Sequence, residues 1–269
     1  MTARKRVGIP PHIYCDPLRG APGEASPFTV ETDQPARLAI ALRERKLDLA
    51  FLAPIDYARD GSLYYIVPDV AAASETGTGA ITLHFPKNLS AIRTLAVDPS
   101  SSSEIILAQI ILGEQFNIRP QLVPVPGTLE EMLGKADAAL LVGDASLRVR
   151  TRDPQMIDLV EEWGEMTGLP YVHGIWCGRE RSADAGDIAT FARLRTAGTD
   201  ALAAIAAAAG TGHGLALDSK TLEEVLGGFQ YLLTEEGVEG LTEFLRFAYY
   251  HGFIPDVAEL QYYDSLNVE

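Results

Sequence analysis

The chain has 269 residues, of which 47% are hydrophobic and 22% are charged, and its formal net charge at pH 7 is −15. This balance is typical of a folded globular protein and argues against extended disorder, collagen or a coiled coil. The strongly negative charge argues against a nucleic-acid backbone or an anionic membrane surface as a partner, so neither is expected.

The two cysteines, Cys15 and Cys177, are too few and too far apart to form the disulfide framework of a secreted protein. The basic beginning of the chain is not followed by an apolar run of signal-peptide length, and no apolar stretch is long enough to span a bilayer. A cytoplasmic location is therefore expected.

Short apolar runs alternate with helical patterns along the first two thirds of the chain, which predicts an α/β fold; the part after about residue 184 is predicted to be mostly helical. The predicted strands are 6–9, 47–52, 61–70, 80–85, 95–97, 121–125, 138–142 and 171–177. The predicted helices of this part are 36–46, one after the serines at 100–103, 128–133, a short one from 143 and 154–166.

The chain has no low-complexity linker and no repeat of solenoid length. This favours two lobes built from discontinuous segments, residues 1–86 with 180–269 and residues 87–179. The crossovers between the lobes are expected at residues 86–88 and 178–185.

The best local signal is a run of four serines, Ser100, Ser101, Ser102 and Ser103, in front of an apolar helix. Hydroxyls and backbone N–H groups at a helix N-terminus can bind an anion such as a carboxylate, because the donors and the helix dipole point the same way. A simple N-cap is the alternative interpretation of the same residues.

A second candidate is the pair Gly143 and Asp144, which follows a predicted buried strand at its C-terminal end. Ligands of open α/β sheets bind at such ends. Asp144 is expected either to cap the helix that follows or to contact a ligand hydroxyl, and capping is the commoner role of such a residue.

The five histidines do not form a metal-binding pattern, so no metal or other cofactor is expected. His12 follows two prolines at the end of the first predicted strand and is expected to face a cleft. His173 lies within a predicted strand and is interpreted as a core histidine. Cys15 has no evident base partner and is not expected to act as a nucleophile.

One further block reads Asp158-Leu159, Glu162-Trp163, Thr167-Gly168-Leu169-Pro170-Tyr171-Val172 and Ile175-Trp176. This block, which is the most specific, and the motifs above together resemble the chorismate dehydratases of the futalosine route to menaquinone, and the resemblance covers nearly the whole chain. The segment from Leu141 to Leu147, with Gly143-Asp144-Ala145 at its centre, and the serine run also look like motifs of that family.

The resemblance implies a periplasmic-binding-protein-like fold of two α/β lobes with a ligand cleft between them. It also implies that chorismate loses water to give 3-[(1-carboxyvinyl)oxy]benzoate. A monomer or homodimer that needs no metal is expected. Tyr14 stands where the family carries a catalytic asparagine, and Ala80 stands where it carries a serine, for which Thr78 or Thr82 is the expected substitute. The alternative hypothesis is a non-catalytic binder of a small aromatic carboxylate such as a hydroxybenzoate.

The motifs and the resemblance together predict Tyr14 and Ser102 as catalytic residues. The predicted ligand-binding residues are His12, Pro54, Thr78, Gly79, Ala80, Ser100, Ser101, Ser103, Gly143 and Asp144.

Overall fold

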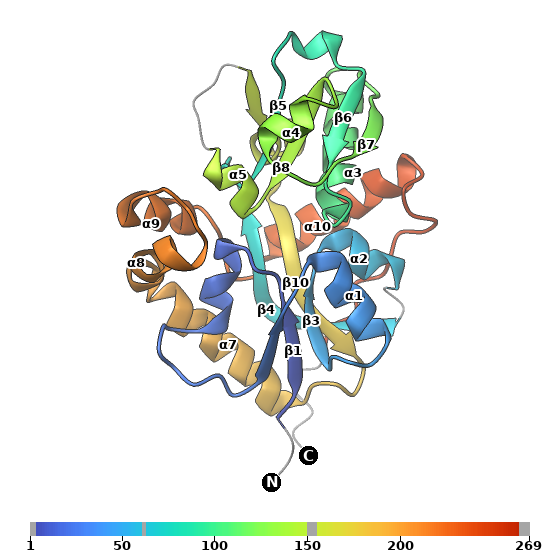
Figure 1. The fold of residues 1–269 in the computed structure, drawn as a ribbon. Coiled ribbons are helices and arrows are strands. Elements are labelled where there is room, and N and C mark those ends of the chain that lie inside the picture. The colour runs from blue at the N-terminus through green and yellow to red at the C-terminus, as the bar shows by residue number, and fades with distance from the viewer. Residues whose placement is uncertain (1–3, 61–62, 150–154, 264–269) are drawn as a thin grey trace.

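A computed structural model describes residues 4–60, 63–149 and 155–263 of the chain. It contains two lobes, each built around a five-stranded mixed sheet. Figure 1 shows the lobes one above the other, with β1 in the lower one.

The sheet of the first lobe has the strand order β2-β1-β3-β10-β4. Strand β1 pairs in parallel with β2 and β3, whereas β10 runs antiparallel to β3 and β4. The strand bounds are β1 (Arg6–Ile9), β2 (Thr29–Thr32), β3 (Leu49–Leu52), β4 (Tyr64–Ser74) and β10 (Tyr171–Arg179).

The sheet of the second lobe has the order β7-β6-β8-β5-β9. Strand β6 pairs in parallel with β7 and β8, and β5 runs antiparallel to β8 and β9. The bounds are β5 (Ile81–His84), β6 (Thr94–Val97), β7 (Gln121–Pro124), β8 (Ala138–Val142) and β9 (Met156–Asp158).

The sheet memberships correct the expected lobe boundaries. Strand β5 belongs to the second sheet and β10 to the first, so the chain crosses between the lobes in segments 75–80 and 168–170. Pro86 lies just after the end of β5 and within the second lobe, so the expected crossover at residues 86–88 is not one. The register of Ile81 with Val142 and of Thr82 with Asp158 holds β5 between two strands of the second lobe.

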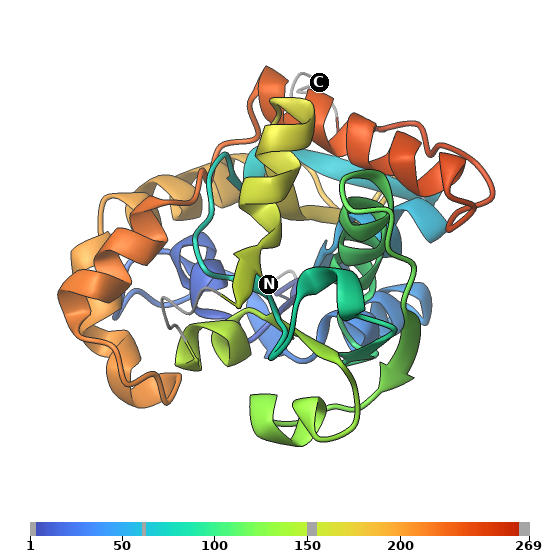
Figure 2. The ribbon, with the colours of Figure 1, turned by 90° about the horizontal axis from the view of Figure 1, so that it is seen from above.

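Helices cover both sheets, and the C-terminal third is helical as predicted. Figure 2 shows α8 and α9 on one side of the molecule and α10 on the opposite side. In the described part of the chain, none of the helices is long and apolar enough to cross a membrane. The bounds are η1 (Ile13–Arg19), α1 (Pro35–Arg43), α2 (Pro54–Arg59), η3 (Leu89–Ala91), α3 (Ser102–Glu114), α4 (Leu129–Leu133), α5 (Asp144–Arg148), α6 (Leu159–Thr167), α7 (Ala185–Thr199), α8 (Leu202–Gly212), α9 (Ser219–Gly227) and α10 (Glu235–Tyr250).

The expected helix 154–166 is wrong at its beginning, and position 154 lies outside the described residues. Residues Met156–Asp158 form β9, which pairs with β5, and α6 begins only at Leu159. The Asp158 carboxylate accepts the backbone N–H of Val160 as the N-cap of α6 and the N–H of Gly79 across the sheet. Local apolar periodicity did not reveal this edge strand because its pairing partner lies more than 70 residues away.

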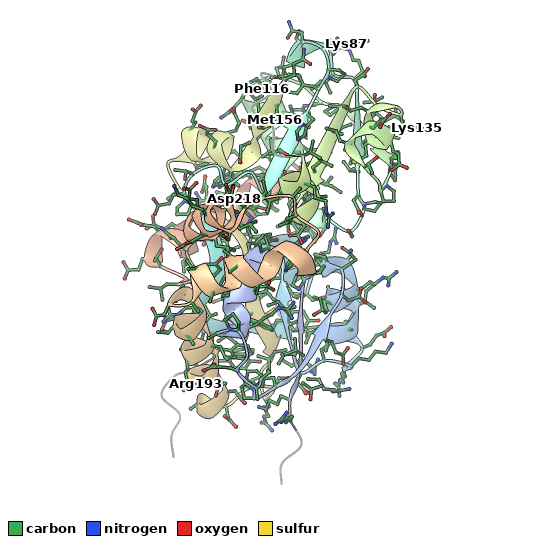
Figure 3. All side chains as sticks on the ribbon, turned by 60° about the vertical axis from the view of Figure 1, so that its left-hand side comes forward. Lys87, Phe116, Lys135, Met156, Arg193 and Asp218 are labelled. Atoms are coloured by element: carbon green, nitrogen blue, oxygen red, sulfur yellow. The ribbon has the colours of Figure 1, made fainter. Side chains whose placement is uncertain are left out.

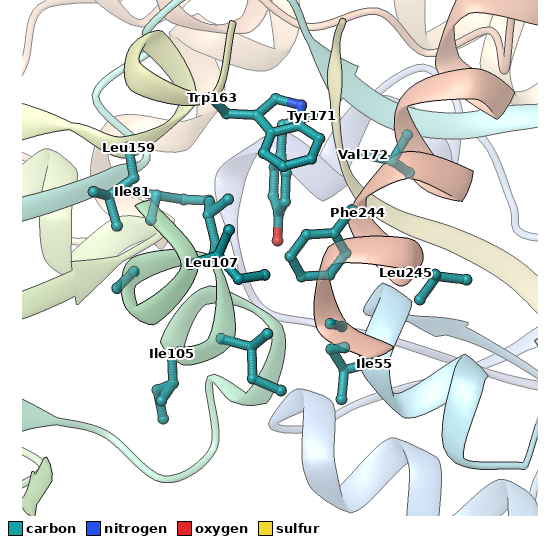
Figure 4. Close-up of a cluster of buried hydrophobic side chains, with 14 of the residues drawn as sticks. Ile55, Ile81, Ile105, Leu107, Leu159, Trp163, Tyr171, Val172, Phe244 and Leu245 are labelled. Atoms are coloured by element: carbon teal, nitrogen blue, oxygen red, sulfur yellow. The ribbon is translucent and has the colours of Figure 1, made fainter. Parts of the chain in front are cut away.

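The apolar core continues from one lobe to the other along one side of the molecule. Figure 4 shows side chains of this core converging from both lobes. Trp163 of α6 is fully buried, packs edge-on against Tyr171, Phe244 and Phe247, and donates its indole N–H to the carbonyl of Pro170 at 3.3 Å. This continuous core makes one side of the interlobe contact apolar, and the ligand-sized cleft lies elsewhere along that contact.

Candidate functional site

A cleft of about 450 Å³ opens between the two lobes. It is bordered by η1 of the first lobe, the N-terminal ends of α3 and α5 of the second lobe, and the C-terminal end of α8. Its polar and charged lining residues include His12, Asp16, Arg19, Thr32, Gln34, Asp98, Ser100, Ser101, Asp144, Arg148 and His213.

The serine run divides between the cleft and the lobe interface. Ser100 and Ser101 line the cleft, and Ser101 is the N-cap of α3 without a side-chain capping bond. Ser102 donates a hydrogen bond to Asp56 of the first lobe at 3.0 Å. Ser103 is fully buried, and its Oγ accepts the backbone N–H of Ile55 at 2.9 Å.

Asp144 does not cap its own helix, which corrects the more common of its two expected roles. Gly143 is the N-cap of α5, and the Asp144 carboxylate accepts the N–H of Ile13 of η1 at 2.8 Å. Two residues of the second lobe, Ser103 and Asp144, thus cap the first turns of α2 and η1 in the first lobe. These bonds satisfy N–H groups that helix starts leave free.

Gly143 is required by close approach as well as by its backbone conformation. Its φ is 60°, and a Cβ atom there would lie 2.2 Å from Nδ1 of His12. A side chain at this position would therefore push His12 out of the wall of the cleft.

Tyr14 lies behind the cleft wall rather than in the wall. It is 4% exposed and stacks between His12 and Phe229, with ring centroids 5.2 and 5.1 Å away. Burial raises its pKa well above 10.0, so the side chain remains a phenol. The phenol therefore supports the His12 ring, and burial lowers the pKa of His12 below 6.5.

His173 is a buried core histidine, as the sequence suggested. It is 2% exposed, its Nε2 lies 2.7 Å from Oγ of Ser74, and burial lowers its pKa to about 3. The ring is neutral and does not line the cleft.

Four other predicted ligand-binding residues lie outside the lining of the cleft. Ala80 is fully buried, Thr78 is 5% exposed, and the N–H of Gly79 binds Asp158. Pro54 is buried at the start of α2.

Thr82, considered as a substitute for the serine of the family, bonds to Ser146 and His84. It lines a separate cavity beside α9, so it does not replace the missing hydroxyl in the main cleft.

Glu104, in the first turn of α3, is a buried carboxyl whose position the sequence did not reveal. It is 4% exposed, and burial raises its pKa from 4.5 to about 7. Burial raises the pKa values of the phenols Tyr14 and Tyr171 of the first lobe, and the charge of Glu104 raises them further.

The donor set of the cleft suits an anion. Among the described residues, no group of three histidine, cysteine or carboxylate side chains is arranged to hold a metal ion. The lining instead offers guanidinium groups, hydroxyls and the start of α3, which are groups that bind carboxylates.

The sequence model of a family described as "Menaquinone biosynthesis" matches residues 5–250. The chain belongs to this family. A curated relative, the chorismate dehydratase of Campylobacter jejuni subsp. jejuni, is 26% identical over 165 residues. That match covers 61% of this chain and 60% of the relative's length.

The fold of this family member is that of the periplasmic binding proteins. A structural-genomics protein from Archaeoglobus fulgidus superposes with a TM-score of 0.71 at 15% identity, covering 93% of this chain and 98% of that one. The aliphatic sulphonate binding protein SsuA of Escherichia coli gives a TM-score of 0.65 at 12% identity, covering 96% of each chain. The expected two-lobed α/β fold is confirmed.

Sequence reasoning missed four charged residues of the cleft in this family member: Asp16, Arg19, Arg148 and His213. The position of His12 after two prolines pointed to the correct segment, and Asp16 and Arg19 follow it in η1. His213 carried no local signal, since 197 residues separate it from Asp16, to which it binds.

Proposed function

We propose that this protein is a chorismate dehydratase, which binds chorismate between its lobes and eliminates one water to form 3-[(1-carboxyvinyl)oxy]benzoate in menaquinone biosynthesis. The observation that carries the proposal is the pair of guanidinium groups that line one cleft from opposite lobes, Arg19 from η1 and Arg148 from α5. Two cations on opposite walls match the two carboxylates of chorismate. Membership of the family and the likeness to the Campylobacter jejuni enzyme support the same reaction.

Arg19 lines the cleft with a guanidinium that already contacts three groups of the protein. Its terminal nitrogens donate to Thr32 and to the carbonyl of Pro10, both at 3.2 Å. Its Nε is buried and has no hydrogen-bond partner among the described residues, although a carboxylate oxygen of Asp16 lies 3.2 Å away. A ligand carboxylate in the cleft would gain a charge-assisted bond from the same guanidinium by replacing one of these contacts.

The reaction needs little acid–base strength from the protein. A C–H bond of the ring and the neighbouring C–OH bond break, a C=C bond forms, and the ring becomes aromatic, which supplies the driving force. A carboxylate of the substrate takes up the ring proton and passes it to the departing hydroxyl, so that one water forms without net proton change. The protein contributes by holding both carboxylates, orienting the ring and excluding bulk water.

His12 is the group best placed to assist the departing hydroxyl, because a neutral imidazole in the cleft wall can donate a hydrogen bond. Tyr14 acts in this proposal as the positioning residue that fixes the His12 ring by stacking. Ser102 acts by holding the start of α3 against Asp56, so that Ser100 and Ser101 face the ligand.

The test is a turnover assay of the purified protein with chorismate, followed by the ultraviolet change and by mass spectrometry of the dehydrated product. Arg19→Gln should raise KM about 10- to 100-fold, because a charge-assisted bond contributes about 1.5–3 kcal/mol. Arg193→Gln is the matched control, since Arg193 lies on α7 near the far end of the first lobe (Figure 3) and lies 3.7 Å from Glu24 in an exposed ion pair. Tight binding of chorismate without formation of product would contradict the dehydratase proposal.

A further inference from the structure

His213 lies between two carboxylates that belong to different lobes. Its Nδ1 is 2.6 Å from Oδ2 of Asp144 in α5, and its Nε2 is 2.8 Å from Oδ2 of Asp16 in η1. The three side chains are 12% to 25% exposed, so this bridge is largely shielded from water. The backbone carbonyl of His213 also accepts a hydrogen bond from Arg148 at 3.0 Å.

This geometry fixes the charge of the ring. A neutral imidazole carries one N–H and can donate to only one carboxylate, whereas an imidazolium donates to both. The two hydrogen bonds accordingly raise the pKa of His213 from 6.5 to about 10. The charged or titratable side chains nearest to the ring are Asp16 and Arg19 on η1, Asp144 and Arg148 on α5, and His12, whose pKa is lowered mainly by burial.

The positive charge of His213 determines the net formal charge of the residues that line the cleft. Among the lining residues that the structure describes, Asp16, Asp98 and Asp144 are acidic, and Arg19 and Arg148 are basic. With His213 protonated the formal charges cancel, and without it an acidic excess remains. Asp16 would then have Arg19 as its nearest cation, at 3.2 Å, and that guanidinium would be less available to a ligand.

We propose that His213 is a specificity-determining residue of the cleft: its ring neutralises Asp16 and Asp144, and so leaves the guanidinium groups of Arg19 and Arg148 to the carboxylates of a small dianion. The inference deepens the proposed function and rests on it in one respect, namely that the ligand is a dicarboxylate. It does not depend on whether the bound ligand reacts.

The test measures calorimetric affinities for an unreactive dianion, benzene-1,3-dicarboxylate, and for its neutral analogue, benzene-1,3-dicarboxamide. His213→Gln should weaken binding of the dianion at least tenfold while changing binding of the diamide less than threefold. Adding Asp16→Asn to His213→Gln removes the surplus charge and should restore most of the affinity for the dianion. A role of His213 in packing alone would weaken both probes and would not be rescued by the second substitution.

His251→Gln is the matched control, because His251 pairs with Glu114 at 3.0 Å and does not line the cleft. Its affinity for the dianion should equal that of the wild type. If the wild type binds the dianion and folded His213→Gln binds it equally well, or if Asp16→Asn brings no recovery, the role of His213 is refuted and the proposed function stands. If the wild type binds no dicarboxylate at all, both proposals are refuted.

Discussion

Two side chains, Ser103 and Asp144, show how ordinary capping residues take part in closing the molecule. Serine and aspartate are common helix caps because their oxygens accept backbone N–H groups. Here each oxygen accepts an N–H group from the opposite lobe, at Ile55 and Ile13. The residue types were evident from the sequence, whereas the identity of the capped helix depends on which helix ends meet in space.

Glu104 makes the stability of the folded protein depend on pH. The folded protein retains the proton of Glu104 up to about pH 7, whereas the unfolded chain releases it near pH 4.5. The folded state is therefore favoured fully below about pH 4.5, loses stability as the pH rises from about 4.5 to about 7, and loses nothing further to this group above that value.

We predict that Glu104→Gln, which mimics the protonated carboxyl, removes this loss. The variant should be more stable than the wild type by up to about 3 kcal/mol at pH 8 and nearly equal to it at pH 4.5. Urea unfolding at the two pH values measures the difference. Glu130→Gln, at an exposed position of α4, serves as the control, and equal effects of both substitutions at pH 8 would contradict the prediction.

At the scale of elements, α6 is the helix that joins the two lobes through apolar contacts. It begins directly after β9 of the second lobe, and Trp163 at its centre packs against Tyr171 of β10 in the first lobe. The left-handed Gly168 ends the helix, and the chain then crosses back to the first lobe. The motif around Trp163 is thus explained by packing at the crossover and not by contact with a ligand.

We predict that Trp163→Ala lowers the free energy of unfolding by about 3–5 kcal/mol, because it leaves a cavity in a close-packed core. Denaturant titration of the purified variant measures this loss. Tyr250→Ala on α10 is the comparison, since Tyr250 is 74% exposed, and it should change stability by less than about 0.5 kcal/mol. A loss for Trp163→Ala no larger than that of the comparison would refute the role of this core.

At the scale of the whole molecule, the contact between the lobes has an apolar part and a polar part. The apolar core around Trp163 is continuous across the lobes, whereas the polar part includes the bonds of Ser102, Ser103, Asp144 and Arg148 to the first lobe. Polar bonds exchange readily with water, and buried apolar surface does not. Opening of the lobes should therefore break the polar part and leave the apolar part as the hinge.

We predict that Ser103→Ala combined with Asp144→Ala opens the ligand-free protein. Small-angle X-ray scattering should show a larger radius of gyration than for the wild type, while circular dichroism shows unchanged secondary structure. Ser90→Ala with Asp256→Ala, at exposed positions away from the cleft, should leave the radius unchanged. An unchanged radius in the first double variant would show that these bonds do not hold the lobes together.

The sequence by itself determined the α/β class, most strands, the helical C-terminal third and the approximate place of the cleft at His12, Ser100, Ser101 and Asp144. These features follow from periodicity, capping chemistry and motifs, which act over a few residues or are retained as a family pattern. Only the tertiary structure decided that β5 belongs to the sheet of the second lobe and β10 to the sheet of the first. It also decided that Tyr14 lies behind His12 and that Ser103 faces the opposite lobe. It also decided that His213 meets Asp16 and Asp144, because an ion pair between distant segments depends on how the lobes pack and leaves no periodic trace along the chain.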